Sequence, residues 1–288
     1  MSEEVRTGTG ARRVPILLGL YAQPPTALRW ALGILPFVLL LIAYFAASEA
    51  RLERNAADKL LPSFQSMFDA MYRMAFEEDQ RSGTYLLLND TIASLKRLMV
   101  GVGCAAAVGL MVGLNVGLFP ALRVLLLPAI TFVSIIPPLA LLPILFIVFG
   151  VDELSKIVLI FIGVAPAITR DLYLTTSQIP TEQITKALTL GASTLGVVYQ
   201  VILPQILPRL IEAVRLSLGA AWLFLIASEA IASTEGLGYR IFLVRRYLSM
   251  DVIIPYALWI TFLGFLVDYA LRVLLRYAYP WYSGGRQQ

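Results

Sequence analysis

The sequence predicts an all-α integral membrane protein with about six transmembrane helices. Apolar residues make up 58% of the 288 residues and charged residues only 15%, whereas a soluble domain of this size carries about a quarter charged residues. The charges also gather in clusters, and the apolar runs between them are long enough to cross about 30 Å of hydrocarbon as helices. These runs are residues 28–48, 98–119, 124–149, 156–176, 206–231 and 252–276.

Composition narrows the chemistry further. The chain has no histidine, and Cys104 is its single cysteine, which excludes an internal disulfide, a cysteine metal cluster and a histidine proton relay. No HExxH helix, G-x-S-x-G turn or phosphate-binding G-x-x-x-x-G-K-[ST] loop occurs. No basic run with interleaved aromatics occurs either, so nucleic acid is not expected as a partner. The chain is therefore predicted to be no enzyme by itself, with no metal and no cofactor.

The first apolar run is predicted to be a retained helix. Ser48-Glu49-Ala50 resembles a signal-peptide cleavage site, but the polar lead of residues 1–27 is too long for an n-region, and residues 28–48 can span a bilayer. In the polar segment that follows, apolar residues recur at helical spacing, which predicts an amphipathic helix on the membrane surface or over the bundle. This stripe, interpreted as a packing face rather than a ligand site, consists of Phe64, Met67, Phe68, Met71, Met74 and Ala75.

The second run carries a small residue at every fourth position. Four residues are just over one helical turn, so these positions form a groove along one face, into which another helix can pack closely. Tight packing is the plain interpretation, and a sliding surface between two transport states is the alternative. The groove residues are Gly101, Ala105, Gly109, Gly113 and Gly117.

The third run is interrupted by Pro137-Pro138 and again by Pro143. Proline removes a backbone donor and clashes with the preceding turn, so this helix is predicted to kink near mid-membrane. Freed carbonyls at membrane depth are tolerated where they face protein or a water-lined cavity. Both a translocation path and a merely structural kink remain open.

The polar interval between the fourth and fifth runs, residues 177–205, predicts two short helices outside the membrane. Pro180 can begin the first and Gly191 can end it. The second is expected to start at Ser193 and to stop near Pro204. Such a compact corner suits either docking into a partner protein or an ordinary surface loop.

This interval resembles the cytoplasmic EAA motif of ABC-importer permeases, in which a glycine is followed after nine residues by I-x-L-P. Here Gly191 is followed after nine residues by Val201-Ile202-Leu203-Pro204. Further segments, in the expected order, resemble the nitrate/sulfonate/taurine/bicarbonate branch of these permeases, and the resemblance runs through most of the chain from Leu60. They are Leu61-Pro62-Ser63, Ser94-Leu95 with Arg97, Pro137-Pro138-Leu139-Ala140 with Leu142-Pro143, Phe149-Gly150, Glu153-Leu154-Ser155-Lys156, Ala227-Ser228-Glu229-Ala230 and Gly236-Leu237-Gly238-Tyr239.

The resemblance implies a type I ABC-importer permease: a multi-pass cell (inner) membrane subunit that works as a homodimer with ABC ATPase subunits and a periplasmic or lipid-anchored solute-binding protein. It also implies an orientation, which Lys and Arg counting leaves open because the two sides carry nearly equal numbers. With the EAA loop in the cytoplasm, the expected organisation is a cytoplasmic tail (1–27), the first transmembrane helix (28–48), a periplasmic amphipathic segment (49–93), the core permease domain (94–276, with the coupling loop at 177–205) and a cytoplasmic tail (277–288).

One departure concerns the coupling motif itself. At the positions of Glu-Ala-Ala this chain has Thr185-Lys186-Ala187, so only the last residue matches. Docking is then expected to depend on shape, and on Lys186 meeting an acidic group. The residues that the resemblance assigns to ATPase coupling are Lys186, Ala187, Leu190, Gly191, Ala192 and Pro204.

The solute path is hypothesised to follow the dimer interface. Glu229 is the sharpest candidate, because an ionisable group within a membrane is commonly functional, although a structural carboxylate bonded to the turn at 236–238 is an equal alternative. The proposed path residues are Ser134, Pro138, Trp222, Ser228 and Glu229.

The solute class has two interpretations. The branch imports small anions such as nitrate, taurine, alkanesulfonates and bicarbonate. Residues 239–259 and the long first loop instead resemble permeases found beside urea-carboxylase-type enzymes, which suggests urea or guanidinium. The rival function is an ion-coupled secondary transporter, but spans two to four carry no central charge and no internal repeat is evident.

Overall fold

The computed structural model describes residues 25–55, 58–79 and 83–284, and this part of the chain is built of helices joined by short turns. An isolated bridge between Glu78 and Tyr85 is the one β-type pairing recorded among these residues. The chain divides into two compact units, residues 1–63 and 64–288, and each is described by itself. The predicted tail at 1–27 lies outside the described residues except for its last three.

In the first unit, α1 (Thr26–Leu52) is long and apolar enough to cross a membrane. It extends beyond the predicted run at both ends. Near its end the Ser48 hydroxyl donates to the Leu61 carbonyl oxygen at 3.0 Å, and the Tyr44 hydroxyl donates to the Pro62 carbonyl oxygen at 2.8 Å. These bonds fold the segment after α1 back along its last turns.

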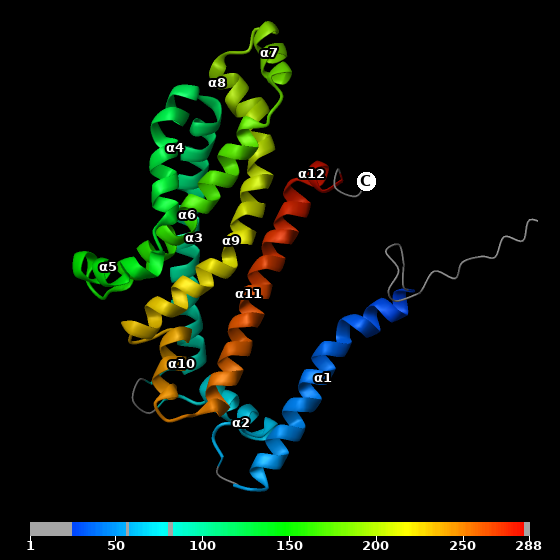
Figure 1. The fold of residues 1–288 in the computed structure, drawn as a ribbon, viewed down its shortest axis with the longest axis vertical. Helices are drawn as coiled ribbons and strands as arrows, with labels where there is room; N and C mark the ends of the chain where they lie inside the picture. The colour runs from blue at the N-terminus through cyan, green and yellow to red at the C-terminus, as the bar shows by residue number, and fades with distance from the viewer. Residues whose placement is uncertain (1–24, 56–57, 80–82, 285–288) are drawn as a thin grey trace, which may run out of the picture. The chain divides into compact units, whose positions relative to one another are not determined.

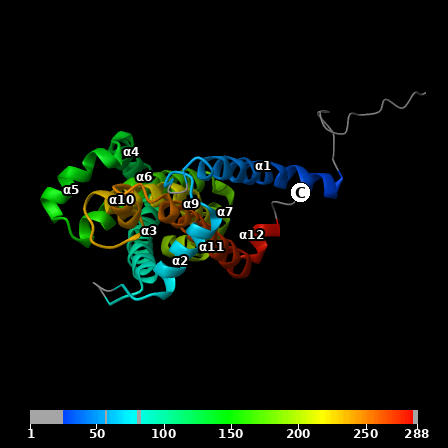
Figure 2. The ribbon, with the colours of Figure 1, turned by 90° about the horizontal axis from the view of Figure 1, so that it is seen from below.

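The second unit is centred on α6 (Glu153–Ser177), which packs against α3 (Leu86–Leu118) and α9 (Leu203–Ile231). Fully buried side chains recur along α6 at helical spacing, namely Leu159, Ile160, Ile168 and Leu172. On the far side of α9 lies α11 (Met250–Ala278), followed by the short α12 (Pro280–Gly284). Figures 1 and 2 both show α4 and α5 on one side of these central helices and α11 on the other.

The small-residue groove of α3 lies against α6. A Cβ added at Gly109 would stand 2.7 Å from Ile168 Cγ2, and one added at Gly113 would stand 2.8 Å from the Thr169 carbonyl oxygen. At the same register Ala105 is completely buried. The absence of larger side chains therefore sets the distance between these two helices.

The third apolar run forms two helices rather than one kinked helix. The first, α4 (Pro120–Ile135), ends just before Pro137-Pro138, and a 3-10 turn (Pro138–Leu141) leads into α5 (Leu142–Phe149) at an angle of 83°. The helix therefore breaks at Pro137-Pro138, as predicted. The second prediction, a further break at Pro143, is wrong, because Pro143 lies in the first turn of α5, where a missing N–H costs nothing.

The polar interval also differs from its prediction. The first short helix is α7 (Thr181–Thr189), as expected, but the second does not stop near Pro204. Instead α8 (Thr194–Val197) passes through a π turn (Val198–Ile202) into α9, giving one helix over Thr194–Ile231. Within this one helix, Pro204 follows almost directly after the widened π turn.

The predicted amphipathic helix is α2 (Phe64–Phe76), which packs against α11 and α3. Its stripe is divided: Met67 is buried and Met71, Met74 and Ala75 pack on the core, whereas Phe68 is 69% exposed. At the same end of this unit lies α10 (Leu237–Arg245), and α7 lies at the opposite end (Figure 1). The described part of the chain thus has five membrane-length helices, or six if the bent pair counts as one span.

Candidate functional site

The segment from α7 to α8 (181–197), called here the α7–α8 segment, is a tight corner beyond the ends of the long helices (Figure 1). Gly191 ends α7 with φ of +88°, a conformation that other residues rarely adopt. The Ala192 N–H donates to the Ala187 carbonyl oxygen at 3.1 Å, which closes the turn, and the Ser193 hydroxyl accepts from the Gly196 N–H at 3.1 Å, which caps α8. The corner is therefore held by its own backbone.

The two faces of the α7–α8 segment differ. Ile184, Ala187 and Ala192 pack on the core of the unit, whereas Leu190 is 88% exposed and Lys186 is also exposed. Further exposed apolar side chains in and next to this segment were not among the sequence-based candidates, namely Leu188, Leu195 and Tyr199. An exposed apolar surface outside the spans can bind a partner protein.

At the other end of the unit, Asp90, Arg97, Glu229 and Arg240 are largely buried and, together with Glu153, which is 54% exposed at their edge, form what we call the buried ion cluster. Arg97 donates to Glu229 at 2.7 Å and to Glu153 at 2.6 and 2.7 Å. The cluster joins α3, α6, α9 and α10 within the protein. Buried charges of this kind are stable only when they are paired and hydrogen-bonded.

Glu229 is completely buried, and both of its carboxylate oxygens have protein donors. Besides Arg97, it accepts from the Ser94 hydroxyl at 2.8 Å and from the Gly238 N–H at 2.9 Å. Gly236 leaves the room for this arrangement, since a Cβ there would stand 2.6 Å from Glu229 Cδ and 2.7 Å from Arg97 Nη1. The geometry is that of a carboxylate bonded to the glycine-rich turn.

Asp90 secures the same turn from α3. It accepts from the Gly236 N–H at 2.9 Å and from Arg240 Nε at 2.8 Å. Burial by itself lowers the pKa of the Arg240 guanidinium, but the hydrogen bond to Asp90 and the attraction of its charge outweigh this and raise the pKa above its ordinary value.

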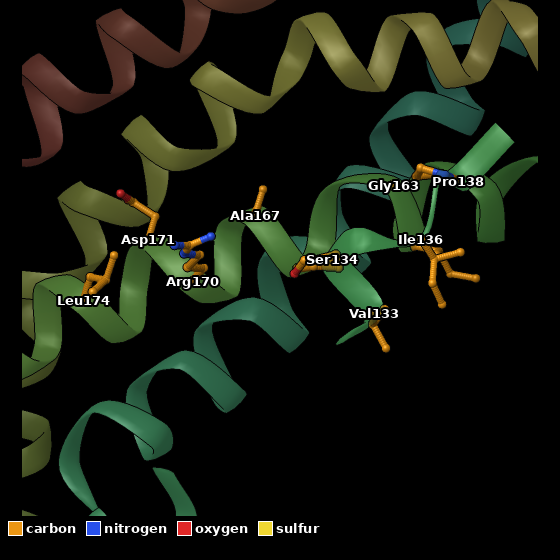
Figure 3. A pocket seen from close by; sticks show the side chains of 11 residues that line it. Val133, Ser134, Ile136, Pro138, Gly163, Ala167, Arg170, Asp171 and Leu174 are labelled. Atoms are coloured by element: carbon orange, nitrogen blue, oxygen red, sulfur yellow. The ribbon is translucent and has the colours of Figure 1, made fainter. Parts of the chain in front are cut away.

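A pocket of about 350 Å³ opens where α4 breaks and passes α6 (Figure 3). Ser134 and Pro138 line it from the broken helix, and Ala167, Arg170 and Asp171 line it from α6. The Ser134 hydroxyl donates to the Ile130 carbonyl oxygen at 2.7 Å. Two of the proposed solute-path residues thus meet in one cavity.

The other three path residues lie elsewhere in the unit. Glu229 and Ser228 are completely buried, and the Ser228 hydroxyl donates to the Leu225 carbonyl oxygen. Trp222 is 8% exposed and its Nε1 has no hydrogen-bond partner among the described residues. The structure therefore brings Ser134 and Pro138 together, and does not place the other three in the lining of that pocket.

Arg170 and Asp171 were not among the sequence-based candidates. Both lie inside the predicted fourth span, residues 156–176, in its last two turns. Their spacing from Gly163 and Ala167 was the available signal, because positions i, i+4 and i+7 or i+8 share a helix face. The described residues contain no group of three His, Cys, Asp or Glu side chains able to hold a metal ion.

Comparison with known proteins agrees with this architecture. Residues 105–282 match the family described as the binding-protein-dependent transport system inner membrane component. The taurine transport system permease protein of Escherichia coli (strain K12) is 33% identical over 77% of this chain and 80% of its own length. The bicarbonate transport system permease protein of Synechococcus elongatus is 32% identical over 65% of this chain and 68% of its own.

Solved structures of an ABC transporter contain a chain with a similar fold. An inward-facing structure of the MetNI methionine ABC transporter superposes with a TM-score of 0.57 at 22% identity, covering 69% of this chain and 98% of that one. A second crystal form gives 0.58 at 21% identity. The fold is thus that of a type I ABC-importer permease. This chain therefore belongs to the family of binding-protein-dependent transport system inner membrane components, as a multi-pass ABC-transporter permease of the nitrate/sulfonate/taurine/bicarbonate branch.

Proposed function

We propose that this chain is the subunit that carries a small anion of the taurine, alkanesulfonate or bicarbonate type into the cell, by alternating access driven by partner ATPases. The relatives' names support the anion class, since they describe permeases for taurine, aliphatic sulfonates and bicarbonate. A solute-binding protein delivers the anion, and a second copy of the chain completes the path. Urea or guanidinium transport has no such support among these relatives.

The observation that carries the proposal is the α7–α8 segment. It is a hydrogen-bonded corner that exposes apolar side chains, and it continues through α8 directly into α9. A force applied to α7 therefore reaches a membrane-spanning helix without a flexible linker. Such a two-state element can be biased by nucleotide at one end and by the loaded binding protein at the other.

This role fixes the orientation of the whole chain. With the α7–α8 segment in the cytoplasm, the C-terminal end of α6 lies at the inner face, and α2, α10 and the buried ion cluster lie at the periplasmic end of the second unit. Residues 1–27 and 277–288 are then cytoplasmic tails, and residues 49–93 belong to the periplasmic side.

The missing glutamate of the coupling motif shifts docking toward shape and apolar contact. Lys186 is exposed and free to approach an acidic group on the ATPase. Leu190 and Gly191 form the tip of the corner, while Ala187 and Ala192 hold it on the bundle. Pro204 contributes indirectly, through the junction that joins α8 to α9.

The decisive experiment introduces a charge at the tip. Leu190→Glu should abolish co-purification of the ATPase subunit co-expressed with the permease, and ATP-dependent uptake with it, because it buries a carboxylate in an apolar contact. The matched control is Leu60→Glu, the same change at an exposed leucine in the loop after α1. The control should retain both properties.

Two results would count against the proposal. If Leu190→Glu keeps the ATPase bound in normal amounts, α7 is not the docking element. If uptake proceeds without any ATPase and collapses when the proton gradient is removed, the chain is the ion-coupled secondary transporter that was its rival.

A further inference from the structure

The pocket beside the broken helix has one cationic side chain among the eleven described residues that line it, Arg170. Arg170 is exposed, and the ion pairs found between described residues do not include it. The neighbouring carboxylate, Asp171, is held by Arg209, whose Nε and Nη2 donate to it at 2.9 and 2.7 Å. The negative charge of Asp171 is thus balanced by Arg209, which does not line the pocket, whereas the positive charge of Arg170 has no such partner among the described residues.

The face of α6 is shaped so that a ligand can reach this guanidinium. Gly163, Ala167 and Arg170 follow one another on the lining face. The ring of Phe224 fills the space beside Gly163, where an added Cβ would collide with it, so the small side chain that leaves room beside Arg170 is that of Ala167. Ala167 itself is exposed. Leu174 closes the same row one turn beyond Arg170 (Figure 3).

The remaining lining groups offer an anion no competing donor. The Ser134 hydroxyl already donates to the Ile130 carbonyl oxygen, so its oxygen faces the pocket only as an acceptor. Apart from the paired Asp171, the other eight described lining residues are apolar or glycine. Recognition of an anion here therefore depends on Arg170.

We propose that Arg170 makes this pocket an anion-binding station on the solute path, where its guanidinium binds the sulfonate or carboxylate group of a small solute. The proposal rests on the proposed transport function for its ligand class. A guanidinium is always charged, and its planar fork gives charge-assisted, paired hydrogen bonds to oxyanions. Arg170 is thereby the residue that favours anions over cations along the path.

The first test measures the sign of the potential in the pocket and needs no knowledge of the solute. Cys104 is replaced by Ala and Ala167 by Cys, which places the only thiol one turn from Arg170. The assembled transporter is then treated with sulfonatoethyl methanethiosulfonate, an anionic reagent, and with its cationic trimethylammonium analogue. A charge about 6 Å away in a partly hydrated site changes their ratio of rates by about tenfold.

We expect the anionic reagent to be favoured with Arg170 present, and the preference to fall about tenfold in Arg170→Gln. Arg170→Lys should keep most of it. Arg246→Gln, which removes an exposed arginine just after α10, is the matched control and should leave the ratio unchanged. An unchanged ratio in Arg170→Gln, a preference for the cationic reagent with Arg170 present, or a thiol that neither reagent reaches would each overturn the proposal.

The second test is transport, with taurine as the probe, in proteoliposomes that contain the ATPase and the binding protein. Arg170→Gln should lower kcat/KM for taurine at least tenfold while the ATPase remains bound, and Arg170→Lys should lower it less. Normal taurine uptake in Arg170→Gln contradicts the proposal. Failure of the docking experiment on Leu190 would leave the reagent ratio intact, so the two proposals fail separately.

Discussion

The guanidinium of Arg97 lies 2.7 Å from the carboxylate of Glu229, and the two side chains are 1% and 0% exposed. They come from α3 and α9, 132 residues apart in the sequence. The pair therefore ties the beginning of one membrane-spanning helix to the end of another. Glu229 is completely buried and its carboxylate oxygens accept from Arg97, Ser94 and the Gly238 N–H, which favours a structural carboxylate over a solute ligand at this position.

Removing the negative charge of this pair should destabilise the protein. In Glu229→Gln the buried Arg97 loses a charged partner, so we expect the free energy of unfolding to fall by about 3 kcal/mol. The thermal unfolding midpoint of the purified permease in detergent measures this. The control is Glu235→Gln, whose carboxylate is 43% exposed and 3.5 Å from Arg97, and it should change stability by less than about 1 kcal/mol.

The same variants decide the role of Glu229 in transport. If Glu229→Gln unfolds at the normal temperature and assembles normally, yet does not transport, Glu229 is a solute-path residue. If transport is also normal, neither role survives.

Gly236 should resist substitution for two reasons. Its φ of +121° is unfavourable for other residues, at a cost of about 1–3 kcal/mol, and a Cβ would collide with Glu229 and Arg97. Gly236→Ala should therefore reduce stability by more than Gly150→Ala. Gly150 also has positive φ, but its nearest neighbour is 3.6 Å away, so equal losses in the two variants would show that the collision is relieved without cost.

Several features of this fold could be predicted because they depend on local chemistry. Hydropathy located the long helices, and the missing N–H groups of Pro137 and Pro138 located the sharp bend. Gly191 located the turn of the α7–α8 segment, because glycine readily adopts the positive φ that such a turn requires.

Other features could not be predicted, because they depend on partners distant in sequence. The sequence-based boundary of the second span lay at residue 98, since Asp90 and Arg97 interrupt the apolar run. In the structure α3 begins at Leu86. Asp90 pairs with Arg240 and Arg97 pairs with Glu229, and both partners come from much later in the sequence. Likewise Arg170, which lies inside the predicted fourth span, could not be assigned to a pocket from the sequence, because the pocket depends on the bend in the neighbouring helix.

The groove of α3 predicts a contrast between two glycines on the same helix. A Cβ at Gly113 would stand 2.8 Å from the Thr169 carbonyl oxygen and 2.9 Å from Leu172 Cβ, whereas a Cβ at Gly103 meets nothing within 4 Å. Gly113→Ala should reduce the free energy of unfolding by about 1–3 kcal/mol, because α3 and α6 must separate. Gly103→Ala should be neutral or stabilising by up to about 1 kcal/mol, since alanine favours helices.

The unfolding midpoint and the transport rate of these two variants together separate the two interpretations of the groove. Loss of stability with a normal turnover per folded molecule indicates a packing surface. A normal midpoint with reduced turnover in Gly113→Ala indicates that α3 and α6 slide past one another during transport.

The exposed lysine of the coupling segment predicts a smaller, salt-dependent effect. If Lys186 meets an acidic group of the ATPase, Lys186→Glu should weaken docking by about two- to fivefold, since an exposed ion pair contributes about 0.2–1 kcal/mol. Titration of the purified ATPase against the permease at low and high salt measures this, and the difference between Lys186→Glu and the unaltered protein should shrink at high salt. Lys59→Glu, a charge reversal at an exposed lysine after α1, controls for net charge. If Lys186→Glu binds the ATPase normally at low salt while Leu190→Glu does not, docking depends on apolar shape alone. Lys186 then does not replace the charged contact that the usual glutamate of the motif would make.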